Sequence, residues 1–258
     1  MDFADEPEKL NMLISAGKEF ELNGEKYWFV VAEDGSCALF DKECKIDDLS
    51  KVKKITIDII REDIKNINIP DSVTHIGYEA FCYCSSLKSI NIPDSVTYIG
   101  IKAFDNCKSL KSVIIPDSVT HIGRYAFANC LSLKSINITD SVTSIGDFAF
   151  YNCISLKSII IPDLAISIGK NAFADCTSLK SINIPESVKS IGEWAFENCK
   201  SLEHIIIPGS VERIGDYAFT WSSSLKKVIF EGKTLDEVKA MNGYPWGIND
   251  KSIIEVEL

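Results

Sequence analysis

Histidine is scarce in this chain, and the common motifs of enzymes are missing. Only three of its 258 residues are histidine. The sequence contains no G-x-S-x-G nucleophile elbow, no glycine-rich phosphate loop and no His-Glu-x-x-His pair. These absences favour a protein that is not an enzyme and that holds neither a metal nor a cofactor.

Long apolar runs and a basic excess are missing as well. No apolar stretch approaches the roughly 18–20 residues that a membrane-spanning helix needs. The formal net charge is -10, which argues against a nucleic-acid partner because such domains are basic. The first residues, MDFADEPEKL, lack the basic and apolar regions of a secretory signal. Two alternatives stay open, a cytoplasmic protein and a mature or trimmed form of an exported one.

A repeat of 23 residues fills the middle of the chain. It occurs seven times without insertion or deletion between Ile69 and Phe230. Three residue types recur with this step: Gly77, Gly100, Gly123, Gly146, Gly169, Gly192 and Gly215; Phe81, Phe104, Phe127, Phe150, Phe173, Phe196 and Phe219; Leu87, Leu110, Leu133, Leu156, Leu179, Leu202 and Leu225. Such a period indicates a solenoid, because one unit is too small to bury its apolar side chains and must stack on its neighbours.

Each repeat predicts a short strand followed by turns. Leu87, Ile90 and Ile92 are apolar with polar residues between them, which fits a short strand facing a core, and Pro93 ends the strand because it has no backbone donor for the ladder. Gly100 is expected to adopt a backbone conformation that other residues resist. Phe104 is expected on a brief helical turn, with its ring stacked on the equivalent rings of neighbouring coils.

The flanks differ from the repeats and predict two caps. Residues 1–66 are expected to form an N-terminal cap, residues 67–230 the solenoid and residues 231–258 a C-terminal cap. The N-terminal cap should contain a helix over 7–16, a meander of strands over 20–22, 27–32 and 37–40, and a degenerate repeat over 55–60. The C-terminal cap should contain a helix that begins with the capping box of Thr234 and Glu237, then a strand over 252–256.

The repeats resemble a known family. The segments IPDSVTYIGIKAFDNCKSLKSV (92–113) and IPESVKSIGEWAFENCKSLEHI (184–205) are similar to BspA-like leucine-rich repeats, with the pattern L-x-x-I-x-I-P-x-S-V-x-x-I-G-x-x-A-F-x-x-C-x-S. Departures are few: Thr139 replaces Pro, Leu164-Ala165 replace Ser-Val, and Ser222 replaces Cys.

This resemblance implies an α/β solenoid, a right-handed leucine-rich-repeat superhelix with a parallel β-sheet on its concave face. It also implies a cell-surface or secreted binding protein, because members of the family are associated with adhesion and with binding to host or matrix.

Six of the nine cysteines form one column of the repeat. They are Cys84, Cys107, Cys130, Cys153, Cys176 and Cys199. A disulfide ladder or a row of metal ligands is the alternative to buried free thiols. Free thiols are favoured because parallel side chains leave the Cβ atoms too far apart and because no histidine joins the column.

Two polar columns also predict structural roles. Asn106, Asn129, Asn152 and Asn198, with Asp175 between them, are expected to bond the backbones of neighbouring coils. The aspartates after the proline position, such as Asp94, are expected to hold the turn through local bonds, with calcium as the less favoured alternative. His75 and His121 share a repeat position that tolerates Tyr98 and Ser144, which indicates a solvated turn.

The outward positions of the strands are the candidate binding site. The predicted binding residues are Lys88, Asn91, Lys111, Ile114, Lys134, Asn137, Lys157, Ile160, Lys180, Asn183, Ile206 and Ile229. The lysines repel one another unless they are screened or paired, so they are retained either for an anionic partner or as a solvated strand surface. The isoleucines form an apolar strip that would seat a partner.

We therefore expect a monomeric, non-enzymatic protein that binds a protein or an anionic polysaccharide through this surface, in surface adhesion. An intracellular protein-protein scaffold is the alternative, and an enzyme with a site near Trp28 in the N-terminal cap is the remaining one.

Overall fold

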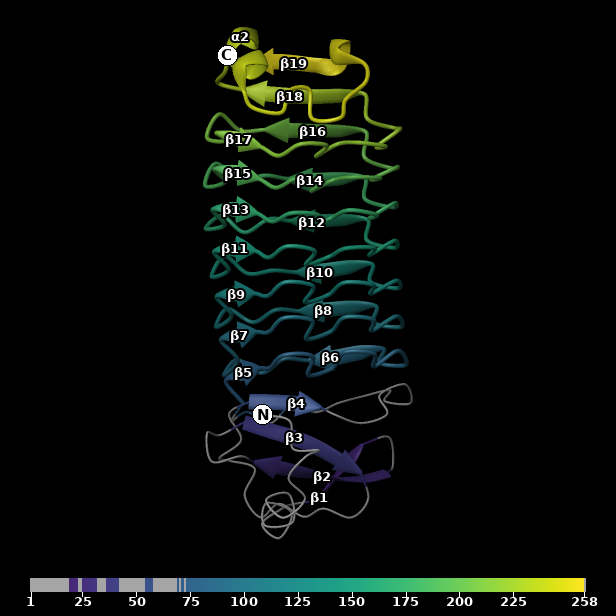
Figure 1. The fold of residues 1–258 in the computed structure, drawn as a ribbon. Coiled ribbons are helices and arrows are strands. Elements are labelled where there is room, and N and C mark those ends of the chain that lie inside the picture. Colours follow the sequence, from purple (N-terminus) through teal and green to yellow (C-terminus); the bar gives the residue numbers. More distant parts are fainter. Residues whose placement is uncertain are drawn as a thin grey trace.

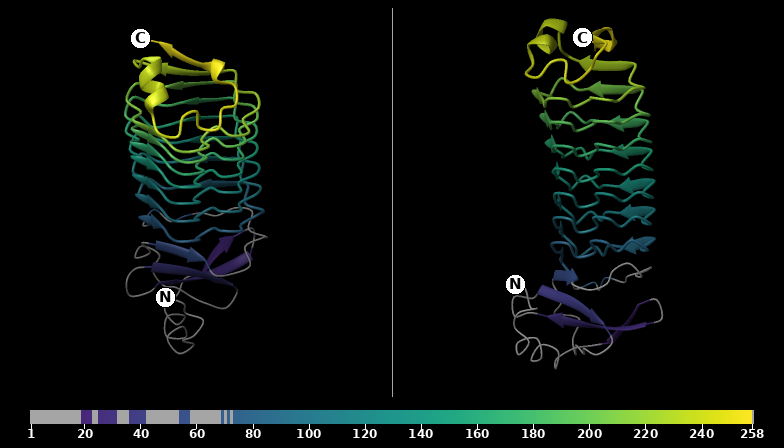
Figure 2. Two further views of the ribbon diagram at one scale, coloured as in Figure 1. Left: turned by 45° about the horizontal axis from the view of Figure 1, so that its top comes forward. Right: turned by 45° about the vertical axis from the view of Figure 1, so that its right-hand side comes forward.

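The computed structural model describes strands over 19–22, 25–31, 36–41 and 54–57, together with residues 69, 71 and 73–257. Within them the chain winds into a stack of coils with parallel strands, and little of it is helical (Figure 1). The expected fold class, a solenoid with parallel strands, is confirmed. Figure 2 shows that the coils stack with little curvature.

Each coil contributes one longer strand to one side of the stack. These strands are β6 (Ser89–Asn91), β8 (Ser112–Ile114), β10 (Ser135–Asn137), β12 (Ser158–Ile160), β14 (Ser181–Asn183), β16 (His204–Ile207) and β18 (Lys227–Glu231). The middle residue of each three-residue strand is buried and its two neighbours are exposed, as the alternation in sequence predicts. The strands pair in parallel and in register within three groups, β6-β8-β10, β12-β14 and β16-β18, for example Ser89 with Ser112 and Asn91 with Ile114.

A second sheet, which the sequence did not predict, runs along another side of the stack. It contains β5 (His75–Ile76), β7 (Tyr98–Ile99), β9 (His121–Ile122), β11 (Ser144–Ile145), β13 (Ser167–Ile168), β15 (Ser190–Ile191) and β17 (Arg213–Ile214). The solvated turn expected at His75 and His121 is therefore wrong: both residues start strands and are exposed. Two-residue strands are too short to produce an alternating pattern.

The N-terminal strands continue this second sheet. β1 (Glu19–Leu22), β2 (Glu25–Val31) and β3 (Ser36–Asp41) pair antiparallel, and β3 then pairs parallel with β4 (Lys54–Ile57), which joins β5. The strands therefore extend the solenoid sheet directly. The helix expected over 7–16 lies outside the described residues, as do the side chains of β1 to β4.

The C-terminal residues close the stack with a helix and a strand. Helix α2 (Leu235–Ala240) begins with the expected capping box, in which Thr234 and Glu237 bond each other's backbone. A short 3-10 helix, η3 (Lys251–Ile253), leads into β19 (Ile254–Glu257). β19 pairs parallel with β18, so an added strand covers the last coil.

The core follows the repeat. The eight inward positions of a coil, from Leu87 to Cys107, are buried. The phenylalanine rings stack along the axis, with centroids 5.1 Å apart for Phe104 and Phe127 and 5.6 Å apart for Phe127 and Phe150. The predicted stacking is confirmed, and it places every coil in the same register.

The turn that carries each phenylalanine is not helical. Alternate backbone donors leave the coil: Phe104 N donates to Ala126 O over 2.7 Å, while Cys107 N donates back to Phe104 O over 3.2 Å. Two residues in this turn, Lys102 and Asn106, have φ of 56° and 61°. The brief helical turn expected here is therefore wrong, because bonds between coils replace the bonds that a helix would make within one coil.

The repeated glycines are required by contact between coils. A Cβ atom at Gly123 would lie 2.7 Å from the carbonyl carbon of Gly100 in the preceding coil. Among the glycines that the structure describes, those with positive φ are Gly232, Gly243 and Gly247, none of which belongs to the column. The expectation of an unusual backbone conformation at Gly100 is wrong; the space between stacked backbones excludes any side chain there.

Candidate functional site

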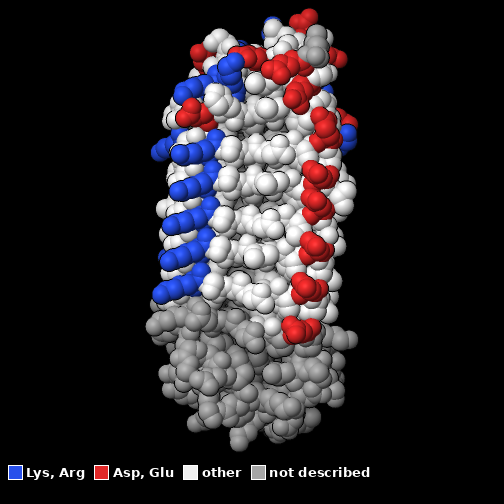
Figure 3. Space-filling view, turned by 180° about the vertical axis from the view of Figure 1, so that it is seen from behind, with Lys and Arg blue, Asp and Glu red and all other residues white. Residues whose placement is uncertain are grey.

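The outer side chains of the longer strands form one continuous surface, which we call the strand face. It comprises the outward residues of β6, β8, β10, β12, β14, β16 and β18 with the residues that flank these strands. Figure 3 shows this face, with a line of basic side chains along one edge and a line of acidic side chains along the other. A neutral strip lies between the two lines.

A column of alternating asparagine and isoleucine runs down the neutral strip. We call it the central column: Asn91, Ile114, Asn137, Ile160, Asn183, Ile206 and Ile229. The exposed fractions are 70% for Ile114, 67% for Ile160 and 47% for Ile206. Because parallel strands lie about 4.8 Å apart, an exposed isoleucine recurs at about twice that distance. Ile229 belongs to the column but is half-buried.

The lysine column forms the basic edge. It contains Lys88, Lys111, Lys134, Lys157 and Lys180, all exposed. Among the described residues the ion pairs involve other lysines, so these five have no acidic partner within the described chain. Five like charges at about 4.8 Å spacing repel one another, which lowers stability unless something outside the chain compensates.

Glu203 interrupts the lysine column at the next coil. Its carboxylate lies 2.7 Å from Lys226 Nζ, one coil further on. The hydrogen bond from Lys226 lowers the pKa of Glu203 below its usual value. The C-terminal end of the basic edge is therefore paired internally, unlike the five coils before it.

The acid column forms the opposite edge, which the sequence did not assign to this face. It contains Asp71, Asp94, Asp117, Asp140, Asp163 and Glu186, and all six are exposed. These aspartates are expected to bond within their own turn. The structure instead shows a bond between coils, in which Asp163 N donates to Asp140 Oδ1 over 3.3 Å. The face therefore carries both signs of charge.

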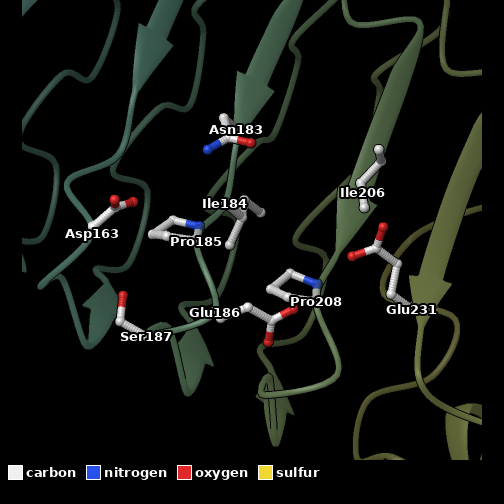
Figure 4. Close-up of a pocket in the computed structure, with 9 residues that line it drawn as sticks. All are labelled: Asp163, Asn183, Ile184, Pro185, Glu186, Ser187, Ile206, Pro208 and Glu231. Atoms are coloured by element: carbon white, nitrogen blue, oxygen red, sulfur yellow. The ribbon is translucent and has the colours of Figure 1, made fainter.

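A shallow hollow lies in the acid column near the C-terminal end. Its volume is 540 Å³. Figure 4 shows its lining at the ends of the strands: Asp163, Asn183, Ile184, Pro185, Glu186, Ser187, Ile206, Pro208 and Glu231. Gly209 stands where preceding coils have an acid, and a Cβ there would lie 2.9 Å from Glu231 O. Gly209 follows Pro208, which lines the hollow together with Ile206.

The cysteine column is buried and free, as predicted. The five thiols from Cys107 to Cys199 also donate to a backbone carbonyl in the preceding coil, for example Cys153 Sγ to Phe127 O over 3.2 Å and Cys176 Sγ to Phe150 O over 3.2 Å. Burial raises the pKa of both thiols well above the usual range. These thiols are therefore unreactive structural groups.

The asparagine column bonds through its side chains. Asn152 Nδ2 donates to Asn129 Oδ1 over 2.9 Å, and Asn198 Nδ2 donates to Asp175 Oδ1 over 2.6 Å. The expectation of bonds to neighbouring backbones is wrong at these positions. The residues have φ between 56° and 61°, a left-handed conformation that asparagine and aspartate tolerate better than most residues.

The described residues also bear on a metal site and on a membrane span. They contain no group of three or more histidine, cysteine or acidic side chains that could hold a metal ion. None of their helices has the length and apolar character to span a membrane. Trp28, near which the enzyme alternative places its site, lies in β2, and its side chain is outside the described residues. All twelve predicted binding residues lie together on the strand face.

Comparison with known proteins agrees with this architecture. A family described as BspA type Leucine rich repeat region, in six copies, matches residues 60–164 and 143–241. Among curated proteins, none matches the chain.

Two crystal structures show the same fold. A leucine rich repeat protein from T. pallidum is 26% identical, with a TM-score of 0.61, and the match covers 77% of this chain and 87% of that one. A leucine-rich repeat protein from Bacteroides ovatus is 25% identical, with a TM-score of 0.55, and the match covers 93% and 76%.

The family match spans more than half of the chain, and the described coils reproduce its period from the first glycine to the last. The chain belongs to the BspA type leucine-rich repeat family.

Proposed function

We propose that this chain is a non-enzymatic protein that binds a protein partner through its strand face. The observation that carries the proposal is the central column, in which Ile114, Ile160 and Ile206 are 47–70% exposed between edges of opposite charge. Isolated exposed apolar residues are ordinary, but a regular strip on a flat, rigid surface is typical of an interaction site.

The charges favour a protein over an anionic polysaccharide. A polyanion that covered the whole face would gain contacts with the lysine column but would also meet the acid column, which repels it. A protein surface can present both signs at once. A narrow polyanion that followed the lysine column alone is the alternative, and binding that weakens as the salt concentration rises would favour it.

Site-specific photo-crosslinking tests the proposal. A benzophenone amino acid would replace Ile160 on the strand face and, as a matched control, Ile166. The control residue is also exposed, by 57% against 67%, but it lies beside the second sheet. The chain would be produced in cells that naturally contain it, irradiated, and its adducts identified by mass spectrometry. We expect protein adducts from position 160 and not from 166. Equal adducts at both positions, or none, would overturn the proposal.

Retention on immobilised heparin tests the alternative. Changing Lys111, Lys134 and Lys157 to Glu should abolish retention if a polyanion is the ligand, because three adjacent attractive charges become repulsive. If the partner is a protein, we expect weak retention of the wild-type chain on heparin. The three lysine changes should then lower the yield of protein adducts from position 160 instead.

A further inference from the structure

The charges on the strand face point to one occupant. We propose that the partner is a second copy of this chain, docked face to face with the two solenoid axes parallel. This inference rests on the proposed function, because it names what covers the same face.

The edges are symmetric about the central column. Lys111 precedes Ile114 by three residues, and Asp117 follows it by three. At about 3.3 Å per residue, each edge lies about 10 Å from the centre. A two-fold axis along the central column, parallel to the solenoid, exchanges the edges, so each lysine column meets the acid column of the other copy. A two-fold axis parallel to the strands, at right angles to the solenoid, would place lysine on lysine, so the charges select the parallel arrangement.

The lysine column and the acid column are also interrupted in the same coil. Five successive coils carry a lysine on one edge and an acid on the other. The coil where Glu203 replaces lysine has Gly209 in place of the acid, so two like charges do not meet there. Within one chain these edges lie about 20 Å apart, beyond the roughly 8–10 Å over which exposed charges act at physiological salt. Each change has a contact of its own within the chain, Glu203 with Lys226 and Gly209 with Glu231 O. A facing copy adds a physical reason for the two changes to fall in one coil.

The central column suits this arrangement. With the two-fold axis along it, Ile114, Ile160 and Ile206 each face the same residue of the second copy and exclude water there. The amides of Asn91, Asn137 and Asn183 face their own equivalents, and an amide carries both donors and an acceptor, so identical amides can pair. Packed sheets lie about 10 Å apart, which leaves room for one layer of these side chains from each copy.

The face is large enough for a specific dimer. Seven coils at about 4.8 Å give a length of about 34 Å, and the edges lie about 20 Å apart. The two copies together would bury on the order of 1,300 Å², near the lower end of the range for specific interfaces. The hollow at Gly209 gives room for the second copy's Glu203 and Lys226, which lie at the same level.

Sedimentation equilibrium with complementary charge variants tests the inference. One variant changes Lys111, Lys134 and Lys157 to Glu, and the other changes Asp117, Asp140 and Asp163 to Lys. We expect the wild-type chain to dimerise at concentrations up to about 100 μM and each variant alone to dimerise at least about tenfold more weakly. An equimolar mixture should recover dimer, because every facing pair is then opposite in sign.

Matched apolar variants locate the interface. Ile160→Asp should abolish the dimer, while Ile166→Asp should leave it unchanged, and circular dichroism should show that both remain folded. A monomeric wild-type chain, or charge variants that dimerise as strongly as wild type, would overturn the inference. If the chain is monomeric but position 160 still crosslinks to a different protein, the proposed function stands and the self-association fails. If position 160 gives no adduct above position 166, both fail.

Discussion

The hydroxyl of Ser222 donates to the backbone carbonyl oxygen of Phe196 over 2.8 Å. Cys199, one coil earlier, makes the same bond from its thiol to Phe173 O over 3.2 Å. Serine and cysteine therefore occupy this buried column in equivalent ways, and the departure at Ser222 conserves the bond.

This equivalence predicts that Cys153→Ser is tolerated. The hydroxyl would keep the bond to Phe127 O, so the free energy of unfolding should fall by no more than about 1 kcal/mol. Cys153→Ala removes the donor and leaves a small cavity, and it should cost about 1–2 kcal/mol more than serine. Urea unfolding of both variants measures the difference. A serine variant less stable than the alanine variant would show that the bond is unimportant.

Stability should fall steeply at alkaline pH. Burial raises the pKa of Cys130, Cys153, Cys176 and Cys199, whereas an unfolded thiol ionises near pH 8.5. Below about pH 8 both states keep the protons, so these groups add no pH dependence. As pH rises above about 8.5 the unfolded state alone loses protons, and each thiol lowers the unfolding free energy by up to about 1.4 kcal/mol per pH unit.

Urea unfolding between pH 8 and 10, under reducing conditions, measures this slope. The variant Cys153→Ser with Cys176→Ser should show a shallower slope than wild type, because a hydroxyl does not ionise in this range. An unchanged slope would mean that other groups cause the alkaline loss of stability.

The glycine column should not tolerate alanine. At Gly123 the added Cβ would lie 2.7 Å from the backbone of Gly100, and neither backbone can move without breaking the bonds between coils. We expect Gly123→Ala to cost about 3 kcal/mol or more. Gly232 is the matched control: its φ is 63° and the nearest atom to an added Cβ is 4.0 Å away, so Gly232→Ala should cost only about 1–2 kcal/mol. Thermal unfolding compares them, and equal costs would contradict the steric explanation.

Replacing Trp221 with asparagine should stabilise the protein. Trp221 stands in the asparagine column with φ of 63°, and its side chain is 69% exposed. Asparagine tolerates this conformation and could bond Asn198 as other members of the column do, so we expect a gain of about 1 kcal/mol. Trp194→Asn should give no gain, because Trp194 stacks on Tyr217 at 5.7 Å and lies under Lys170 Nζ. A loss of stability at 221 would show that its ring packs more tightly than its exposure indicates.

The period alone predicts the solenoid, its buried positions and the outward strand residues, because one repeated pattern fixes the environment of every equivalent side chain. It does not predict the second sheet, since two residues such as Tyr98 and Ile99 carry no periodicity. It also does not predict why Gly123 is glycine, because that depends on the distance to Gly100 in another coil. The acid column was visible in the sequence, but placing it on the strand face required knowing how the chain turns at Pro93.

The identical step from coil to coil also bears on how such a face changes over time. Duplication or loss of one 23-residue unit would add or remove one row of basic, central and acidic side chains and leave the other rows unmoved. Affinity could then evolve in equal increments by changes in gene length, while point substitutions such as the one at Glu203 would determine which rows take part.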